Sequence, residues 1–228
     1  MIKSVFIDLD ETLFDFHKAE RIALTEMLSR FKIVPDEDMT KRYSLINKSQ
    51  WELLEKKEKT REEVLTDRFT IFFEEIGVNV DSKKAREIYE GLLGDGHYFI
   101  EGAEELLEAL YGKYDLYLAS NGTESVQVRR IASSGIARYF KEIFISQALG
   151  HDKPSCEYFD ACFSKIPDFS PENAIIIGDS LSSDILGGKN AGIKTCLFNP
   201  TKKENKTDII PDFEVGSLGE IPGLLERI

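Results

Sequence analysis

The sequence has few cysteines, no long hydrophobic run and no excess of positive charge. Its 228 residues include only three cysteines, Cys156, Cys162 and Cys196. These are too few and too scattered for a disulfide framework, and none has a second thiol or a histidine at zinc-ligand spacing. No apolar stretch approaches the ~20 residues of a membrane span, and no leader-like apolar segment precedes the first predicted strand. We therefore expect a soluble cytoplasmic protein with reduced cysteines.

The sequence contains fewer basic than acidic residues. The chain has 29 lysines and arginines against 41 aspartates and glutamates, which gives a formal net charge of -12 at pH 7. This balance disfavours binding to nucleic acid polymers and to anionic membranes, because both are negatively charged surfaces. A small anion could still bind, but a phosphate ligand would need a local basic pocket.

Short apolar runs alternate with segments of helical periodicity over much of the chain. In the first run, Val5, Phe6 and Ile7 are consecutive, which indicates a strand buried on both faces. The runs cover residues 4–9, 116–119, 143–145, 174–177 and 194–198. Strands that alternate with helices are typical of a parallel sheet with crossover helices, so we predict an α/β fold.

A long helical block separates the first predicted strand from the others. Apolar residues recur there at helical spacing, for example at Leu24 and Leu28, and no strand pattern interrupts them. The first strand must therefore pair with strands that follow the block, which makes the block an insertion. The predicted boundaries are an all-helical insertion at residues 16–99 and a sheet-forming part at residues 1–15 and 100–228.

Polar clusters follow three of the predicted strands, and one more opens a predicted helix. They are Asp8, Asp10 and Thr12 at the carboxyl end of the first strand, Ser120, Asn121 and Gly122 after the second, Lys153 and Pro154 at the helix, and Asp179 and Asp184 after the fourth strand. The carboxyl ends of parallel strands meet at one edge of the sheet, which is where open α/β sheets bind ligands. We expect the four clusters to converge there.

The composition of these clusters predicts a cation and a phosphate. Four carboxylates brought together raise one another's pKa unless a positive charge compensates them, and Mg²⁺ prefers carboxylate, water and phosphate oxygens. Ser120 and the backbone N–H groups of Asn121 and Gly122, at a strand-to-helix turn, suit phosphate oxygens. Lys153 would supply the remaining positive charge.

The four clusters, in this order, resemble the motifs of the haloacid dehalogenase-like hydrolase superfamily. In addition, "DETLFDF" at residues 10–16 and the tail "FNP…PDFEV" are similar to the pyrimidine 5'-nucleotidase group of that superfamily, which acts on nucleoside monophosphates. Glu101-Gly102 departs from the pattern, since many members carry Pro-Gly at the return from the insertion. This departure concerns only the local turn.

The resemblance implies a Rossmann-like catalytic core with helices on both faces of its sheet, and a helical cap domain over residues 16–99. It also implies catalytic roles. Asp8 would attack phosphorus to form an aspartyl-phosphate, and Asp10 would protonate the leaving oxygen and then activate water. Thr12 would hold the loop and Asp10 in place, while Lys153 would act in catalysis and in phosphate binding.

The resemblance further implies a set of metal ligands. Mg²⁺ would be bound by the Asp8 side chain, the Asp10 backbone carbonyl and Asp179. Asp184 would lie outside the ligands and orient a water molecule or Lys153. The phosphate group would be bound by Ser120, Asn121, Gly122 and Lys153.

The predicted activity is magnesium-dependent hydrolysis of a phosphomonoester, with a nucleoside 5'-monophosphate as first choice and a monomer or homodimer as the expected state. A sugar-phosphate or phosphoglycolate phosphatase and a mutase are alternatives on the same fold. From another class, a receiver-like phosphoacceptor module would share an aspartate, a lysine and Mg²⁺, but the helical insertion and Asp10 speak against it. An inactive binding protein and a dehalogenase are disfavoured by the complete motif set, Asp10 in particular.

Overall fold

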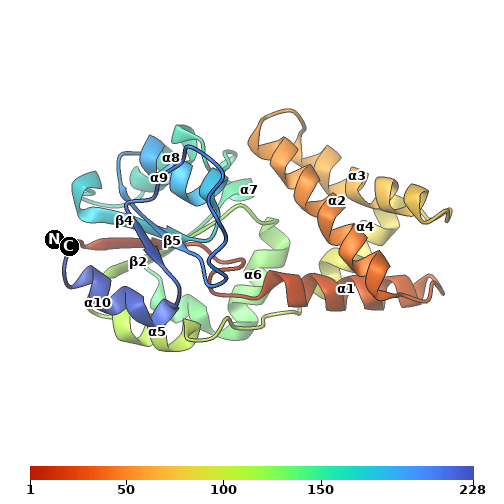
Figure 1. The fold of residues 1–228 in the computed structure, drawn as a ribbon, viewed down its shortest axis with the longest axis horizontal. Helices are drawn as coiled ribbons and strands as arrows, with labels where there is room; N and C mark the ends of the chain where they lie inside the picture. The colour runs from red at the N-terminus through yellow and green to blue at the C-terminus, as the bar shows by residue number, and fades with distance from the viewer. The chain divides into compact units, whose positions relative to one another are not determined.

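The computed structural model describes all 228 residues, Met1–Ile228. A parallel sheet with helices on both faces forms one unit, Met1–Asp15 and Tyr98–Ile228, and an all-helical unit, Phe16–His97, interrupts it in sequence (Figure 1). The strands are β1 Ser4–Ile7, β2 Asp115–Ser120, β3 Glu142–Ile145, β4 Ala174–Gly178, β5 Lys194–Phe198 and β6 Phe213–Val215. The prediction of an α/β fold is confirmed.

Four helices form the all-helical unit, and six belong to the sheet-containing unit. The first set is α1 Phe16–Arg30, α2 Glu37–Glu55, α3 Arg61–Glu75 and α4 Ser82–Leu93. The second set is α5 Ala103–Leu110, α6 Glu124–Ser134, α7 Ser146–Leu149, α8 Cys156–Phe163, α9 Leu186–Asn190 and α10 Ile221–Leu225. None of these helices has the length and apolar character that a membrane crossing requires.

The sheet order is β3-β2-β1-β4-β5-β6, with all neighbouring strands parallel. β1 lies between β2 and β4, and Phe6 is in register with Tyr117 on one side and Ile176 on the other. All four β1 residues are buried, as the unbroken apolar run predicts for a central parallel strand. From β1 the chain adds β2 and then β3 on one side, and it adds β4, β5 and β6 on the other side. The order in which strands are added therefore reverses beside β1, and open parallel sheets bind ligands at such a point.

Helices cover each face of the sheet with a separate hydrophobic core. On one face, Leu107 of α5 and Leu224 of α10 pack with Val5 and Ile7. On the other, α8 packs Tyr158, Phe159 and Cys162 around Phe6. Figure 1 shows α5 and α10 on one side of the sheet and α8 and α9 on the opposite side. The sheet is therefore fixed on both faces, and only its edges and strand ends are available for ligands.

Aromatic side chains form the core of the all-helical unit. The Tyr43 ring lies 5.3 Å from Phe69, 5.4 Å from Phe72 and 5.5 Å from Tyr89, measured between ring centroids. Local capping signals set the helix starts. The side chain of Asp36 accepts a hydrogen bond at the N-terminus of α2. Thr60, in a capping box, is the N-cap of α3, and Asp81 is the N-cap of α4.

The boundaries differ from the sequence prediction by one or two residues in several places, including the end of the insertion, which is His97 rather than residue 99, and two strands differ more clearly. β1 ends at Ile7 rather than Leu9, although the Asp8 N–H still donates to the Ile177 carbonyl at 2.9 Å. The sixth strand, β6, was not predicted, because it has three residues and pairs only with β5 at the sheet edge. Its central residue, Glu214, is exposed, which leaves little apolar signal.

Candidate active site at the carboxyl ends of the central strands

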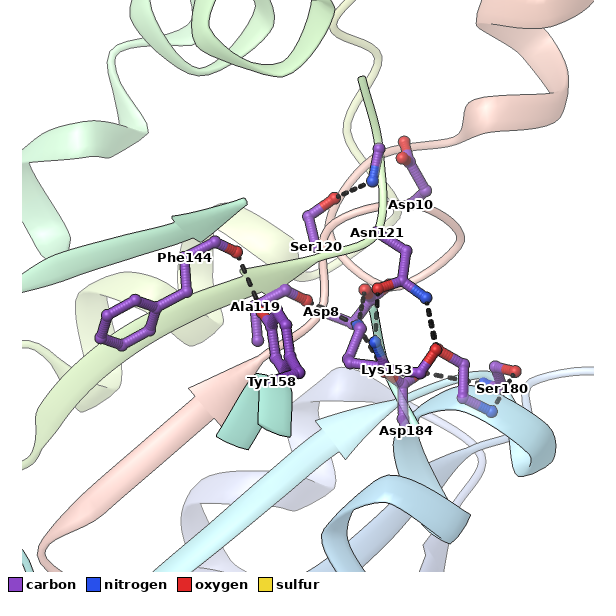
Figure 2. Close-up of polar contacts among 12 residues, drawn as sticks. Asp8, Asp10, Ala119, Ser120, Asn121, Phe144, Lys153, Tyr158, Ser180 and Asp184 are labelled. Carbon is purple, nitrogen blue, oxygen red and sulfur yellow. Dashed lines mark hydrogen bonds and ion pairs between the residues drawn. The ribbon is translucent and has the colours of Figure 1, made fainter. Parts of the chain in front are cut away.

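Lys153 lies at the centre of the site, in the loop between α7 and α8. Its ammonium donates to Asp8 Oδ1 at 2.7 Å, to Asp184 Oδ1 at 2.7 Å and to the Ala119 carbonyl at 2.6 Å. Figure 2 shows the lysine side chain directed toward both carboxylates. An ammonium group has three donors, so this geometry satisfies all of them. The side chain is only 1% exposed, and such a buried cation is tolerated because it is paired and fully hydrogen-bonded.

Asn121 fixes the backbone of that lysine. The Lys153 N–H donates to Asn121 Oδ1 at 2.9 Å, and Asn121 Nδ2 donates to the Lys153 carbonyl at 2.9 Å. Asn121 Nδ2 also lies 3.3 Å from the Ser183 hydroxyl oxygen. The Asn121 side chain, which follows β2, therefore positions the Lys153 backbone. It links the polar cluster after β2 directly to the cluster at Lys153 and Pro154.

Burial raises the pKa of two carboxyl groups in the site, Asp8 and Asp179. It raises the pKa of Asp8 from 3.8 to about 7, because desolvation outweighs the attraction of Lys153 and the Asp184 charge adds to it. Partial burial and the nearby Asp8 carboxylate raise the pKa of Asp179 well above its usual value. Burial alone would lower the pKa of Lys153, but Asp184 and Asp8 reverse this and raise it. The site holds more negative charge than its lysine compensates.

The carboxylates fit a hard divalent cation. Oxygen atoms of Asp8, Asp179 and Asp184 all lie within 4.8 Å of one another. Both Asp184 oxygens already accept hydrogen bonds, from Lys153 and from the Ser180 N–H at 3.1 Å. Three carboxylates around one ammonium leave an excess of negative charge and a set of oxygen donors that suits Mg²⁺. The assignment of Asp8 and Asp179 as ligands, with Asp184 as their support, stays a prediction.

The loop after β1 places Asp10 on another side of the site from Lys153. Backbone hydrogen bonds from Leu13 and Phe14 to the Leu9 carbonyl, at 2.9 and 2.8 Å, fold the loop back on itself. Glu11 adopts a left-handed backbone conformation, with φ of 59°. Thr12 is fully buried and its hydroxyl has no hydrogen-bond partner. Backbone contacts therefore hold this loop in the structure, and a holding role for the Thr12 hydroxyl stays a prediction.

Two residues that contact Asp10 were not predicted from the sequence. Arg130 Nη1 lies 2.5 Å from Asp10 Oδ1, and Gln127 Nε2 donates to Asp10 Oδ2 at 2.7 Å. Gln127 Nε2 also lies 2.9 Å from Ser120 Oγ, which accepts a hydrogen bond from the Gly122 N–H at 3.1 Å. Polar residues spaced i, i+3 lie on the same face of a helix, and this spacing in α6 was the available signal.

Gly178, at the end of β4, leaves room for Asp184. A Cβ atom at this position would lie 2.2 Å from Asp184 Oδ2 and 2.7 Å from Asp184 Cβ. Because Lys153 and the Ser180 N–H hold the Asp184 carboxylate, the clash cannot be relieved by rotation alone.

We therefore expect Gly178→Ala to lower the free energy of unfolding by about 1–3 kcal/mol, the usual range for overpacking. Denaturant unfolding measures the change. The matched control is Gly223→Ala in α10, where an added Cβ meets nothing within 4 Å. Equal stabilities for the two variants would contradict this account of Gly178.

Comparisons with known proteins agree with the geometry. The family model described as haloacid dehalogenase-like hydrolase matches residues 5–198. The chain is 39% identical to the HAD-hydrolase YfnB of Bacillus subtilis, covering 98% of this chain and 95% of YfnB. A crystal structure of YfnB described as bound to magnesium superposes with a TM-score of 0.94, at 38% identity over 98% of each chain.

Two further relatives are named as nucleotidases. The chain is 36% identical to the pyrimidine 5'-nucleotidase PynA of Streptococcus pneumoniae, covering 99% of this chain and 95% of PynA. It is 29% identical to the pyrimidine 5'-nucleotidase YjjG of Escherichia coli, covering 97% and 96% of the two chains. The family predicted from the four motifs is confirmed. The chain belongs to the haloacid dehalogenase-like hydrolase family and is an enzyme.

Proposed function

We propose that this hydrolase is a magnesium-dependent phosphatase that acts on nucleoside 5'-monophosphates through an aspartyl-phosphate. The observation that carries the proposal is Asp8 at the end of β1, held by Lys153 on one oxygen and within reach of Asp179. Similarity to PynA and YjjG supports the choice of a nucleotide among small phosphorylated metabolites.

Asp8 is suited to act as the nucleophile. Lys153 binds its Oδ1, which orients the carboxylate and leaves Oδ2 for attack on phosphorus. In the first step the Oδ2–P bond forms and the bond from phosphorus to the ester oxygen breaks, with the electron pair going to that oxygen. Asp10 gives a proton to the leaving oxygen. Asp10 then takes a proton from water as water attacks phosphorus and the Oδ2–P bond breaks.

Charge compensation accounts for the other residues. Ser120 and the turn at Asn121 and Gly122 would bind the oxygens of the phosphate group, and the Lys153 ammonium, whose donors already bond to protein oxygens, would contribute its positive charge. Asp8, the Asp10 carbonyl and Asp179 would hold Mg²⁺, which, when bound, neutralises charge on the phosphate and on the carboxylates. Asp184 accepts a hydrogen bond from the Lys153 ammonium and so keeps Lys153 in position. We further propose that residues 16–99 act as the cap that selects the substrate.

Phosphate release from a panel of phosphomonoesters tests the substrate assignment. We expect kcat/KM for pyrimidine nucleoside 5'-monophosphates to exceed that for hexose phosphates and phosphoglycolate by about tenfold or more, equivalent to about 1.4 kcal/mol. A higher kcat/KM for the sugar phosphates or phosphoglycolate would contradict it. A single turnover without release of inorganic phosphate would instead indicate a phosphoacceptor module.

Removal of divalent cations should abolish turnover, and Mg²⁺ should raise the Tm in a pH-dependent manner. The pKa of Asp8 rises from 3.8 in the unfolded chain to about 7 in the folded one, so the metal-free protein loses stability as the pH rises through this window. Above that window Asp8 is ionised and ready to bind a cation. Below it, the cation must displace a proton.

We therefore expect a larger Mg²⁺-induced rise in Tm at about pH 8 than at about pH 5.5. Thermal unfolding with and without Mg²⁺ at the two pH values checks this. The Asp160→Asn variant, which changes an exposed carboxylate on α8, is a matched control and should respond as the wild type does. Full activity after chelation, or Tm shifts that are equal at both pH values, would contradict the prediction.

A further inference from the structure

We propose that Gln127 and Arg130 of α6 are positioning residues, which hold the Asp10 side chain in its catalytic position and connect it to Ser120. The inference rests on the proposed function, because the position of Asp10 matters only if Asp10 transfers protons during phosphoryl transfer.

Each oxygen of the Asp10 carboxylate has its own donor. Arg130 Nη1 lies 2.5 Å from Oδ1, and Gln127 Nε2 lies 2.7 Å from Oδ2. Arg130 Nη1 also donates to Gln127 Oε1 at 3.0 Å, which ties the two donors together. A carboxylate bound at both oxygens cannot rotate about its χ angles without breaking one of these contacts. The pair therefore fixes both the position and the orientation of Asp10.

Arg130 is buried where a charge is costly. It is 0% exposed, and its guanidinium lies 5.2 Å from the centroid of the Phe14 ring, on the loop that carries Asp10. A buried guanidinium needs a paired carboxylate, and Asp10 provides one although its own side chain is 26% exposed. The arginine thus contacts Asp10 and Phe14 on a single loop, as expected for a residue that fixes this loop.

Gln127 links Asp10 to the phosphate-binding turn. Its Nε2 reaches both Asp10 Oδ2 and, at 2.9 Å, Ser120 Oγ. Gly122 is required for this arrangement, because a Cβ atom there would lie 2.2 Å from Gln127 Nε2. The amide is 1% exposed and sits on the same turn of α6 as Arg130. A shift of Gln127 would therefore move the proton-transferring carboxylate relative to the phosphate.

Leaving-group dependence distinguishes positioning of Asp10 from a general structural role. A nucleoside monophosphate has a poor leaving group and needs protonation by Asp10, whereas p-nitrophenyl phosphate has a good one and does not. General acid catalysis contributes about 10²–10⁴-fold to a rate. We therefore expect Arg130→Met to lower the single-turnover phosphorylation rate for both esters unequally, with a loss for the nucleotide that is about tenfold or more larger than the loss for p-nitrophenyl phosphate. Gln127→Leu should produce the same selective loss and is the second variant if Arg130→Met does not fold.

A double-mutant cycle with Asp10→Asn completes the test. If Arg130 acts through Asp10, Arg130→Met should cause no further selective loss in the Asp10→Asn background. Arg129→Met replaces an exposed arginine on the same helix and should leave both rates unchanged. Equal losses for the two substrates in folded variants, or additive losses in the double mutant, would overturn the proposal. If the wild type releases no phosphate from either ester, the proposed function itself is wrong. This failure differs from failure of the positioning proposal, because it is seen in the wild type and not only in the variants.

Discussion

Asp8→Asn is expected to lower the rate of phosphate release by about 10⁴-fold or more, the scale seen when a covalent nucleophile is removed. Asparagine keeps the shape of the side chain but is a poor nucleophile and removes one of the charges around the cation. The fold should survive, because Lys153 still donates to Asp184 and to the Ala119 carbonyl. Steady-state phosphate release measures the first effect, and thermal unfolding measures the second.

The control for this variant is again Asp160→Asn. It makes the same chemical change at an exposed position on α8 and should keep wild-type activity. Phosphate release near the wild-type rate from a folded Asp8→Asn protein would remove the basis for a covalent mechanism.

The second large effect is expected for Lys153→Met. Methionine has a similar length but no charge, so Asp8 and Asp184 would face each other in the protein interior without the ammonium that now lies 2.7 Å from each. Breaking a buried ion pair from one side costs about 3–5 kcal/mol of unfolding free energy. Turnover should also be lost, because Lys153 orients the nucleophile.

The pH dependence of this loss has a definite sign. The Lys153 ammonium lowers the pKa of Asp8, so its loss should raise that pKa above the wild-type value of about 7. Protonation of Asp8 in the variant removes its repulsion with Asp184, so the deficit relative to wild type should shrink as the pH falls from alkaline values toward about 7. Denaturant unfolding of both proteins over a pH series checks this. Lys165→Met, at an exposed position, should be close to wild type at every pH. A Lys153→Met deficit that grows on acidification would contradict the account of charge in the site.

The sequence predicted the sheet well because its central strands are short unbroken apolar runs. Residues 174–177, four consecutive apolar side chains, are fully buried in β4, and the polar clusters that follow such strands meet at one edge. The contacts around Lys153 follow from this convergence, since Asp8 and Asp184 come from the ends of β1 and β4. The local sequence pattern was therefore sufficient to predict which residues lie at the ends of the strands.

The contacts of Asp10 could not be predicted in the same way. Gln127 is 117 positions from Asp10 and Arg130 is 120, and their meeting depends on how α6 packs against the loop after β1. Arg130 has the residue type of a solvent-exposed position, so only the tertiary structure shows that it is buried. β6 was missed for a related reason, because its place in the sheet is set by hydrogen bonds such as that from the Asn199 N–H to the Val215 carbonyl, at 2.9 Å.

Chemical trapping of the intermediate tests the central claim most directly. The enzyme would be mixed with a nucleoside 5'-monophosphate and Mg²⁺, quenched with acid during turnover, and treated with borohydride, which reduces an aspartyl-phosphate to homoserine. We expect peptide mass spectrometry to locate homoserine at position 8 in the substrate-treated wild type and nowhere in Asp8→Asn. Phosphate release in the same experiment with position 8 unmodified, or with the modification at Asp10 or Asp179, would contradict Asp8 as the nucleophile.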